Sequence, residues 1–256
     1  MDTAAWKIRL DSCRKVLVGL GEEWRIGDDP EKRKTVLKAY EALYQLLKDK
    51  DYFIITMATD AVIYETLLGS RTETAVSSDR VHGELFSCTA DEAMMAKMDQ
   101  IFPVKEQPKD TRWQRIVAPC GNETWRQCSA GCTKDIWEPG EIPDDICPHC
   151  GAPLTGNTME ASPYIEEGYL PQWSRYTRWL TGTLNQELLI LELGVGFSKP
   201  GVIRFPFEKT AFFNQKAFLY RVHPVLPQIT EELHGRAEGI AEPSVAWIRN
   251  ISEVTV

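Results

Sequence analysis

The sequence lacks a long apolar run, a signal segment and an excess of positive charge. Its longest apolar stretch, LLILELGVGF at 188–197, is far too short to span a bilayer and contains Glu192. The N-terminal residues MDTAAWKIRLDSCRK contain no apolar core followed by a cleavage site of small residues, so we do not expect them to form a signal peptide. We therefore expect a cytoplasmic protein that has no membrane partner.

The charge balance argues against a nucleic-acid partner. The formal net charge of the 256-residue chain is −8, whereas proteins that bind nucleic acids usually present a basic stripe. The basic cluster EKRKTVLK at 31–38 begins with an acidic residue and lies in an expected helix, where it indicates a solvated helix face. The length is sufficient for one large domain, or for a large domain with a small insert.

The seven cysteines are an odd number in a chain without a secretion signal, which disfavours a disulfide framework. Four of them form two tight pairs, Cys128/Cys132 and Cys147/Cys150, with fourteen residues between the pairs. Thiolates on short turns supply the four tetrahedral ligands that Zn²⁺ prefers. The pattern predicts a zinc ribbon with these four cysteines as ligands. A thioredoxin-like redox pair is the alternative, but it requires a helix directly after the pair, and Pro153 follows instead.

A shell of four thiolates is closed, so the predicted zinc is structural rather than catalytic. Gly151 follows the second pair and permits the positive φ that turns backbone N–H groups toward the sulfur. His149 lies between two ligands and is expected to point outward. Cys120 remains an alternative ligand, whereas Cys13 and Cys88 are expected to be buried small apolar residues.

Short apolar runs alternate with helical patterns along the chain. Asp29 and Pro30 begin a helix over 29–50, in which apolar residues recur at helical spacing. The expected buried strands lie within RKVLVGLGEEW at 14–24, DYFIITMATD at 51–60, LLILELGVGF at 188–197 and KAFLYRVHP at 216–224. This pattern predicts an α/β fold with a Rossmann-like parallel sheet covered on both faces.

Residues 61–160 interrupt this pattern with a turn-rich sequence that contains Cys and Pro. We expect this range to be an inserted small module whose zinc ribbon spans about 118–156. Residues 1–60 and 161–256 would then form the Rossmann-like nucleotide-binding domain, whose ligand lies at the carboxyl ends of the strands.

A dinucleotide-type fold with an inserted four-cysteine ribbon resembles the sirtuin family. The matching segments are VLVGLGEEW, YFIITMATD, QCSAGC with CPHCG, and LLILELGVGFSKPGVIRFPFE. The last segment is the most specific and is nearest to the microbial sirtuins found beside macrodomains. The resemblance implies an NAD-dependent protein deacylase or ADP-ribosyltransferase, with NAD as cofactor and a structural Zn²⁺. Its partner would be an acylated or ADP-ribose-accepting protein.

The resemblance also implies roles for individual residues. Asp60 would orient the nicotinamide, and the general base would be His82, which precedes Gly83, or Cys120, which precedes Gly121. Both assignments stay open. The residues implied in cofactor binding are Gly19, Gly21, Asp60, Gly194, Gly196, Phe197 and His223. For His223 the alternative is a cap at the end of its strand.

Four residues depart from the family pattern. Glu22 and Glu23 follow the first glycines and would repel a pyrophosphate unless they turn away. Met57 and Ala58 replace the Gln and Asn that hold the nicotinamide ribose in the family. The alternative function is therefore a catalytically degenerate protein that binds NAD, ADP-ribose or a protein partner without turnover. Glutamates 22 and 23 pointing into the crevice would favour that alternative.

Overall fold

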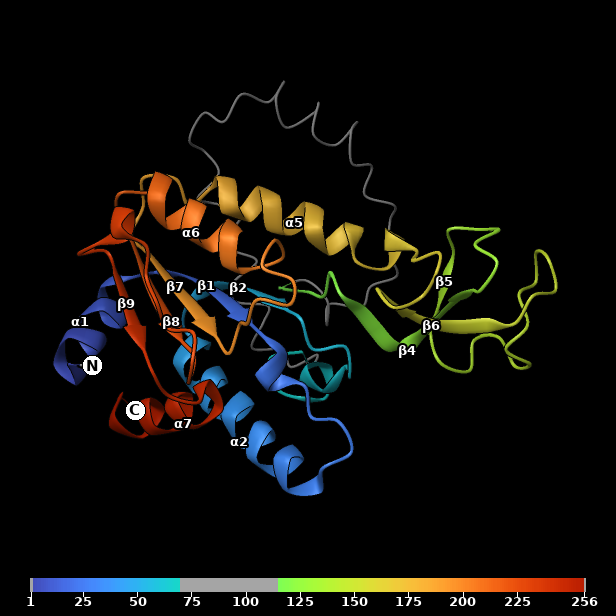
Figure 1. Cartoon of the computed structure of the whole chain (residues 1–256), viewed down its shortest axis with the longest axis horizontal. Helices are drawn as coiled ribbons and strands as arrows, with labels where there is room; N and C mark the ends of the chain where they lie inside the picture. Colours follow the sequence, from blue (N-terminus) through green and yellow to red (C-terminus); the bar gives the residue numbers. More distant parts are fainter. Residues whose placement is uncertain (1, 70–114, 256) are drawn as a thin grey trace.

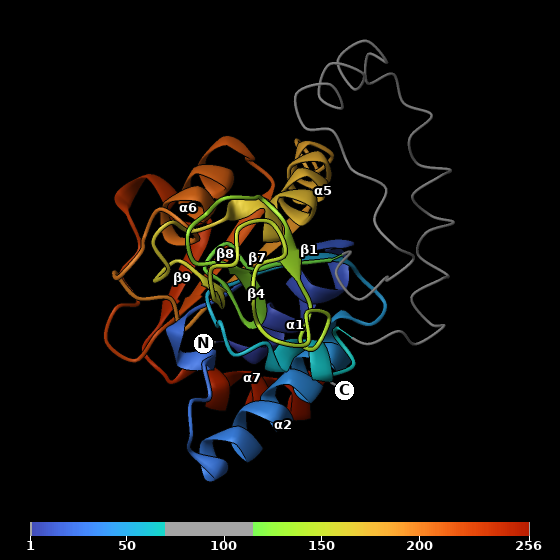
Figure 2. The ribbon, with the colours of Figure 1, turned by 90° about the vertical axis from the view of Figure 1, so that its right-hand side faces the viewer.

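The computed structural model describes residues 2–69 and 115–255. Its described part contains a parallel sheet in the order β3-β2-β1-β7-β8-β9 and a three-stranded antiparallel sheet in the order β5-β4-β6 (Figure 1). The predicted α/β class, with a Rossmann-like parallel sheet and a small cysteine-containing module, is confirmed. Figure 2 views the molecule from the end at which this small module lies.

The central strands of the large sheet are largely apolar because helices cover both faces of the sheet. Every residue of β7 is buried, as are all but the first residues of β1 and β2. The large sheet consists of β1 (Lys15–Leu20), β2 (Asp51–Thr56), β3 (Ile116–Val117), β7 (Leu188–Leu193), β8 (Ala217–Val222) and β9 (Ala237–Ile240). The small sheet consists of β4 (Gly121–Cys128), β5 (Ile136–Trp137) and β6 (Leu154–Thr158).

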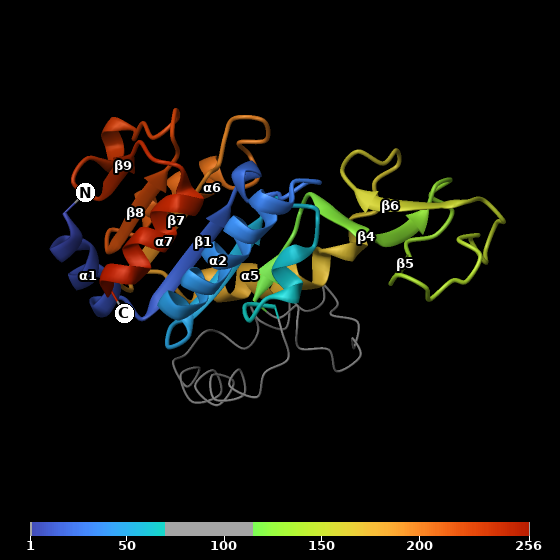
Figure 3. The same cartoon turned by 90° about the horizontal axis from the view of Figure 1, so that it is seen from below.

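Two helical layers enclose the large sheet and create two apolar cores. The first core lies under α1 (Thr3–Ser12), α2 (Pro30–Leu47) and α7 (Ser244–Thr255), which Figure 3 shows from below. The second lies under α5 (Leu170–Thr181) and α6 (Arg204–Phe213) on the opposite face (Figure 1). The short 3₁₀ segments of the described residues are η1 (Glu22–Trp24), η2 (Val62–Glu65), η5 (Glu166–Gly168) and η6 (Glu231–Leu233).

Helix α2 begins where the sequence predicts. The Asp29 carboxylate accepts hydrogen bonds from the backbone N–H groups of Glu31 and Lys32, and Pro30 occupies the first helical position. Its buried face carries Val36, Ala39, Tyr40, Leu43, Leu46 and Leu47. This spacing turns one stripe of the helix toward the sheet and leaves the basic cluster on the outer side.

One strand of the large sheet comes from the range that the sequence predicts to be a separate inserted module. Strand β3 falls within residues 61–160, but it pairs in parallel with β2 at the edge of the large sheet. The division of the chain into two domains stays a prediction, because residues 70–114 lie outside the described part. In the described ranges, no helix is both long and apolar enough to cross a membrane.

Candidate functional site

Ligands of open α/β sheets bind at the carboxyl edge of the sheet, and we use the word crevice for this edge of the large sheet, where β1 and β7 run side by side. We call residues 21–28 the first loop and residues 194–203 the second loop. The Gly21 N–H donates to the Leu193 carbonyl oxygen over 2.8 Å. A Cβ at Gly21 would lie 2.0 Å from the Gly194 carbonyl oxygen, so the two loops contact each other directly.

Gly19 serves the packing of a helix against the sheet. A Cβ at Gly19 would lie 2.4 Å from Ile203 Cγ2 and 2.7 Å from Phe207 Cε2, at the start of α6. Close approach of a helix is one of the reasons a nucleotide-binding turn contains glycine. In this structure the space beside Gly19 and Gly21 is occupied by protein atoms.

Gly21→Ala is expected to destabilise the protein by about 1–3 kcal/mol, because the clashing atom belongs to a backbone that cannot rotate away. Gly201→Ala is the matched control, since nothing lies within 4 Å of a Cβ there. The control should change stability by less than about 1 kcal/mol. Urea unfolding of the two variants measures the difference, and equal midpoints would contradict the tight contact between the loops.

The two glutamates of the first loop point in different directions. Glu22 reaches into the crevice, where its Oε2 accepts the Gly196 N–H over 3.0 Å and its Oε1 bonds the Ser198 hydroxyl. Partial burial disfavours the charged form, but these hydrogen bonds outweigh it and lower the pKa of Glu22. Glu22 is therefore an anion held by the second loop.

Glu23 turns away and anchors α7. Its Oε2 accepts the Ser244 N–H over 2.9 Å and the Ser244 hydroxyl over 2.7 Å. The positive end of the helix dipole at the start of α7 stabilises a carboxylate at this position. Of the two acids expected to repel a phosphate, only Glu22 faces the crevice.

A buried cluster of charged side chains, formed by Glu192, Arg204 and Arg221, packs against the second loop. Glu192 is fully buried and accepts from Arg221 Nε over 2.6 Å and from Arg221 Nη2 over 2.9 Å. Arg204 Nη1 lies 3.4 Å from the same carboxylate and 3.3 Å from the Val195 carbonyl oxygen. The Arg204 guanidinium carbon also lies 4.3 Å from the ring centroid of Phe197. The cluster thus holds both the backbone of the loop and its exposed aromatic ring.

His223 caps the turn after β8. Its Nδ1 accepts the backbone N–H groups of Val225 and Leu226 over 3.1 and 2.9 Å. These donors assign the ring proton to Nε2. Burial is the largest influence on the imidazole and lowers its pKa, so the ring is neutral at pH 7. The Nε2–H group is the donor that remains for a ligand.

Asp60 joins the end of β2 to the first loop. Its Oδ2 accepts the Ile26 N–H over 2.7 Å, and its Oδ1 accepts the Val62 N–H over 3.3 Å. The neighbouring Met57 and Ala58 are buried, and Met57 belongs to the apolar core on the α5 side. Those two side chains therefore serve packing.

Cys120 lies at the start of β4 beside the crevice. The thiol is buried within the same apolar core, and burial raises its pKa, while Lys199 acts in the opposite direction. A thiol with a raised pKa stays protonated at neutral pH, so it is poorly suited to accept a proton. The other predicted base, His82, lies outside the described residues.

A polar network connects the small module to the crevice. No local motif in the sequence predicts this network. Glu123 in β4 accepts from Arg25 Nη2 over 2.7 Å and also bonds the Thr59 hydroxyl. The Glu123 N–H donates to the Thr59 carbonyl oxygen over 2.8 Å. These contacts join the first loop, the end of β2 and the small sheet, which are far apart in the sequence.

The four predicted metal ligands come together in the small module. The sulfurs of Cys128, Cys132, Cys147 and Cys150 all lie within 4.8 Å of one another, and three of the separations are 3.5 Å. Zn–S bonds of about 2.3 Å in a tetrahedron require sulfur separations of about 3.8 Å. The site therefore has the donors and the size for Zn²⁺. Cys120 is not among the clustered thiols.

The electrostatics of the cluster also fit a cation. Backbone N–H groups of Cys132 and Ala130 lower the pKa of Cys128 to about 6. Hydrogen bonding to Cys150 and the other neighbouring thiols raises the pKa of Cys132. The negative charge of Cys128 acts in the same direction, because adjacent thiolates repel one another. A divalent cation removes that repulsion. Gly131 and Gly151 adopt φ of 60° and 75°, as expected for turns around a metal.

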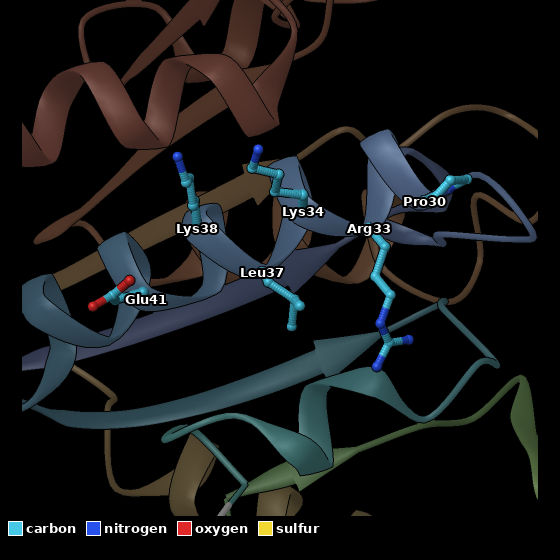
Figure 4. Close-up of a pocket in the computed structure, with 6 residues that line it drawn as sticks. All are labelled: Pro30, Arg33, Lys34, Leu37, Lys38 and Glu41. Carbon is cyan, nitrogen blue, oxygen red and sulfur yellow. The ribbon is translucent and has the colours of Figure 1, made fainter.

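His149 points away from the sulfurs, as predicted. Its Nε2 lies 3.0 Å from an Asp135 carboxylate oxygen, and its ring stacks on Trp137 with the centroids 6.4 Å apart. A separate shallow groove lies on α2 alone (Figure 4) and is lined by Pro30, Arg33, Lys34, Leu37, Lys38 and Glu41. None of these six residues takes part in the crevice contacts described above.

Comparison with known proteins supports the resemblance found in the sequence. No family model matches the chain. A probable bifunctional ADP-ribose hydrolase/ADP-ribosyltransferase of Fusarium oxysporum f. sp. cubense is 32% identical over 78 residues, which are 30% of this chain and 13% of that protein. A protein ADP-ribosyltransferase of Staphylococcus aureus is 26% identical over 98 residues, which are 38% of this chain and 31% of that protein. The chain thus matches less than a third of the length of either relative.

The solved structure of a mutant Sir2 homologue in complex with ADP-ribose is similar over the whole chain. The TM-score is 0.51 at 13% sequence identity, and the similarity covers 100% of this chain and 96% of the other. At this low sequence identity, the structural similarity shows the fold alone. The fold inferred from the glycine loops and the cysteine pairs is confirmed.

Proposed function

We propose that this divergent sirtuin-like protein binds the ADP-ribose part of NAD in the crevice and transfers ADP-ribose to a protein acceptor. The observation that carries the proposal is the sirtuin-like fold along the whole chain, which brings both glycine loops and Cys120 to one sheet edge. Ligands of open α/β sheets bind at this edge. The ADP-ribosyltransferase names of both relatives support transfer of ADP-ribose over deacylation.

The residues around the crevice have separate roles in this proposal. NAD, when bound, supplies an ADP-ribosyl group with nicotinamide as the leaving group. His223 would donate its Nε2–H to a ribose hydroxyl, and Asp60 would orient the nicotinamide while it holds the first loop. His82 or Cys120 would take a proton from the attacking group. The raised pKa of the buried Cys120 thiol favours His82 for that step.

Binding without turnover is the second candidate, and two observations favour it. Met57 and Ala58 are packed in the protein interior, where neither can hydrogen-bond a reacting ribose. The Glu22 carboxylate also occupies donors in the second loop. In this alternative the zinc module and the crevice serve recognition of NAD, ADP-ribose or a protein partner.

Isothermal titration of the zinc-loaded protein with NAD and with ADP-ribose, followed by a nicotinamide-release assay, tests both candidates. Transferase function requires binding, together with release that is lost in His82→Ala or in Cys120→Ser. Cys13→Ser is the matched control, because Cys13 is another buried cysteine outside the metal cluster. Binding without release would support the second candidate. Absence of binding by both ligands would contradict the transferase and the nucleotide-binding form of the second candidate, and would leave only recognition of a protein partner.

A further inference from the structure

The second loop presents two hydrogen-bond donors at the surface of the crevice. The Gly196 N–H and the Ser198 hydroxyl belong to the loop that follows β7 (Leu188–Leu193), at the carboxyl end of a parallel strand. Backbone N–H groups and hydroxyls in such turns bind anions, and phosphates in particular. In this protein an anion already occupies them, because both carboxylate oxygens of Glu22 bond to the two donors.

Glu22 is exposed, in contrast to the half-buried Glu23 and the fully buried Glu192. Glu192 is buried among arginines, and Glu23 is held at the start of α7 by two hydrogen bonds. Each of those acids would leave buried donors unpaired if it moved. Glu22 can rotate into solvent, and only the two donors of the second loop would then need another anion.

We propose that Glu22 is a specificity-determining residue, an internal carboxylate that competes with a ligand phosphate for the Gly196 N–H and the Ser198 hydroxyl. A phosphate would have to displace Glu22, and a ligand without phosphate would not. The inference rests on the proposed binding of ADP-ribose. It adds that the resident glutamate reduces the affinity for the phosphate-containing part of that ligand.

The charges around Glu22 are consistent with this role. Burial lowers the pKa of the His223 ring and Arg204 acts in the same direction, whereas Glu23 and Glu22 oppose them. The neutral ring supplies no fixed positive charge to a phosphate. Lys199 follows Ser198 directly, and Arg204 is held by Glu192 and by backbone carbonyl oxygens. A phosphate that reached the second loop would meet Lys199 after Glu22 had left. Removal of the Glu22 charge should therefore favour the phosphate strongly.

The test is isothermal titration of the full zinc-loaded chain with ADP-ribose and with adenosine, which has no phosphate. Glu22→Ala is expected to lower the dissociation constant for ADP-ribose at least tenfold and to leave that for adenosine within about twofold. Glu22→Gln keeps the side-chain shape without the charge and should shift ADP-ribose binding in the same direction. Glu253→Ala makes the same change in net charge on the exposed face of α7 and should leave both constants unchanged.

The outcomes separate this inference from the proposed function. Equal or weaker ADP-ribose binding by both Glu22 variants would overturn the inference and leave the proposed function standing. Equal tightening for adenosine would also overturn it, because competition with a phosphate cannot affect adenosine. Absence of binding by every variant with either ligand would overturn the proposed function and, with it, this inference.

Discussion

Cys147→Ser is expected to abolish stoichiometric zinc binding and to unfold the small module. Cys147 is buried at the metal cluster beside Cys128 and Trp137. The apolar cluster that these three residues form is too small to stabilise the module alone. Structural zinc in comparable peptide sites contributes about 10–16 kcal/mol of binding free energy, most of which is folding free energy. Loss of one ligand should therefore remove the main source of stability of the β4–β6 region.

The measurement is the zinc content per chain, followed by near-UV circular dichroism, to which Trp125 and Trp137 of the small module contribute. The wild-type chain should contain one zinc, and a chelator should reproduce the spectrum of the variant. Cys13→Ser is the control for thiol number, since Cys13 is buried under α1 and lies apart from the cluster. A Cys147→Ser protein that retained one zinc and its spectrum would contradict the assigned ligands.

Local sequence patterns predicted those helices, strands and turns that depend on interactions between neighbouring residues. The four buried strands were recognisable because each is a short apolar run, and α2 because Asp29 and Pro30 precede a helical stripe. The clustering of the four cysteines was predictable because zinc knuckles need only a few neighbouring residues. These parts of the fold depend on interactions within one element or one turn.

The crevice was less predictable because its contacts join distant residues. The Glu22 carboxylate meets Gly196 across 174 positions, and Glu23 meets Ser244 across 221. The sequence indicated that two acids follow Gly21, but it contained no signal for the direction of either. Gly19 likewise matches a cofactor-binding motif, while its close neighbours in the structure are Ile203 and Phe207 of the α6 region.

Arg221→Met is expected to destabilise the protein by about 3–5 kcal/mol, because it leaves the Glu192 carboxylate buried without its bidentate partner. At about 2–4 °C per kcal/mol for a chain of this size, the unfolding midpoint should fall by about 6–20 °C. Arg33→Met is the matched control. Its ion pair with Glu65 is 2.6 Å long but exposed, and such pairs contribute about 0–1 kcal/mol. Similar unfolding midpoints for the two variants would contradict the stabilising role of the buried pair of Glu192 and Arg221.

The double variant Glu192→Met/Arg221→Met separates the cost of an unpaired charge from the value of the ion pair. The double variant contains no unpaired Glu192 carboxylate, although the buried Arg204 loses its ion pair with Glu192, so it should recover only part of the stability that Arg221→Met loses. Arg204 would still donate to the carbonyl oxygens of Val195 and Leu226. If stability returns but ADP-ribose binding does not, the cluster positions the second loop for its ligand. If both return, the cluster acts on folding alone.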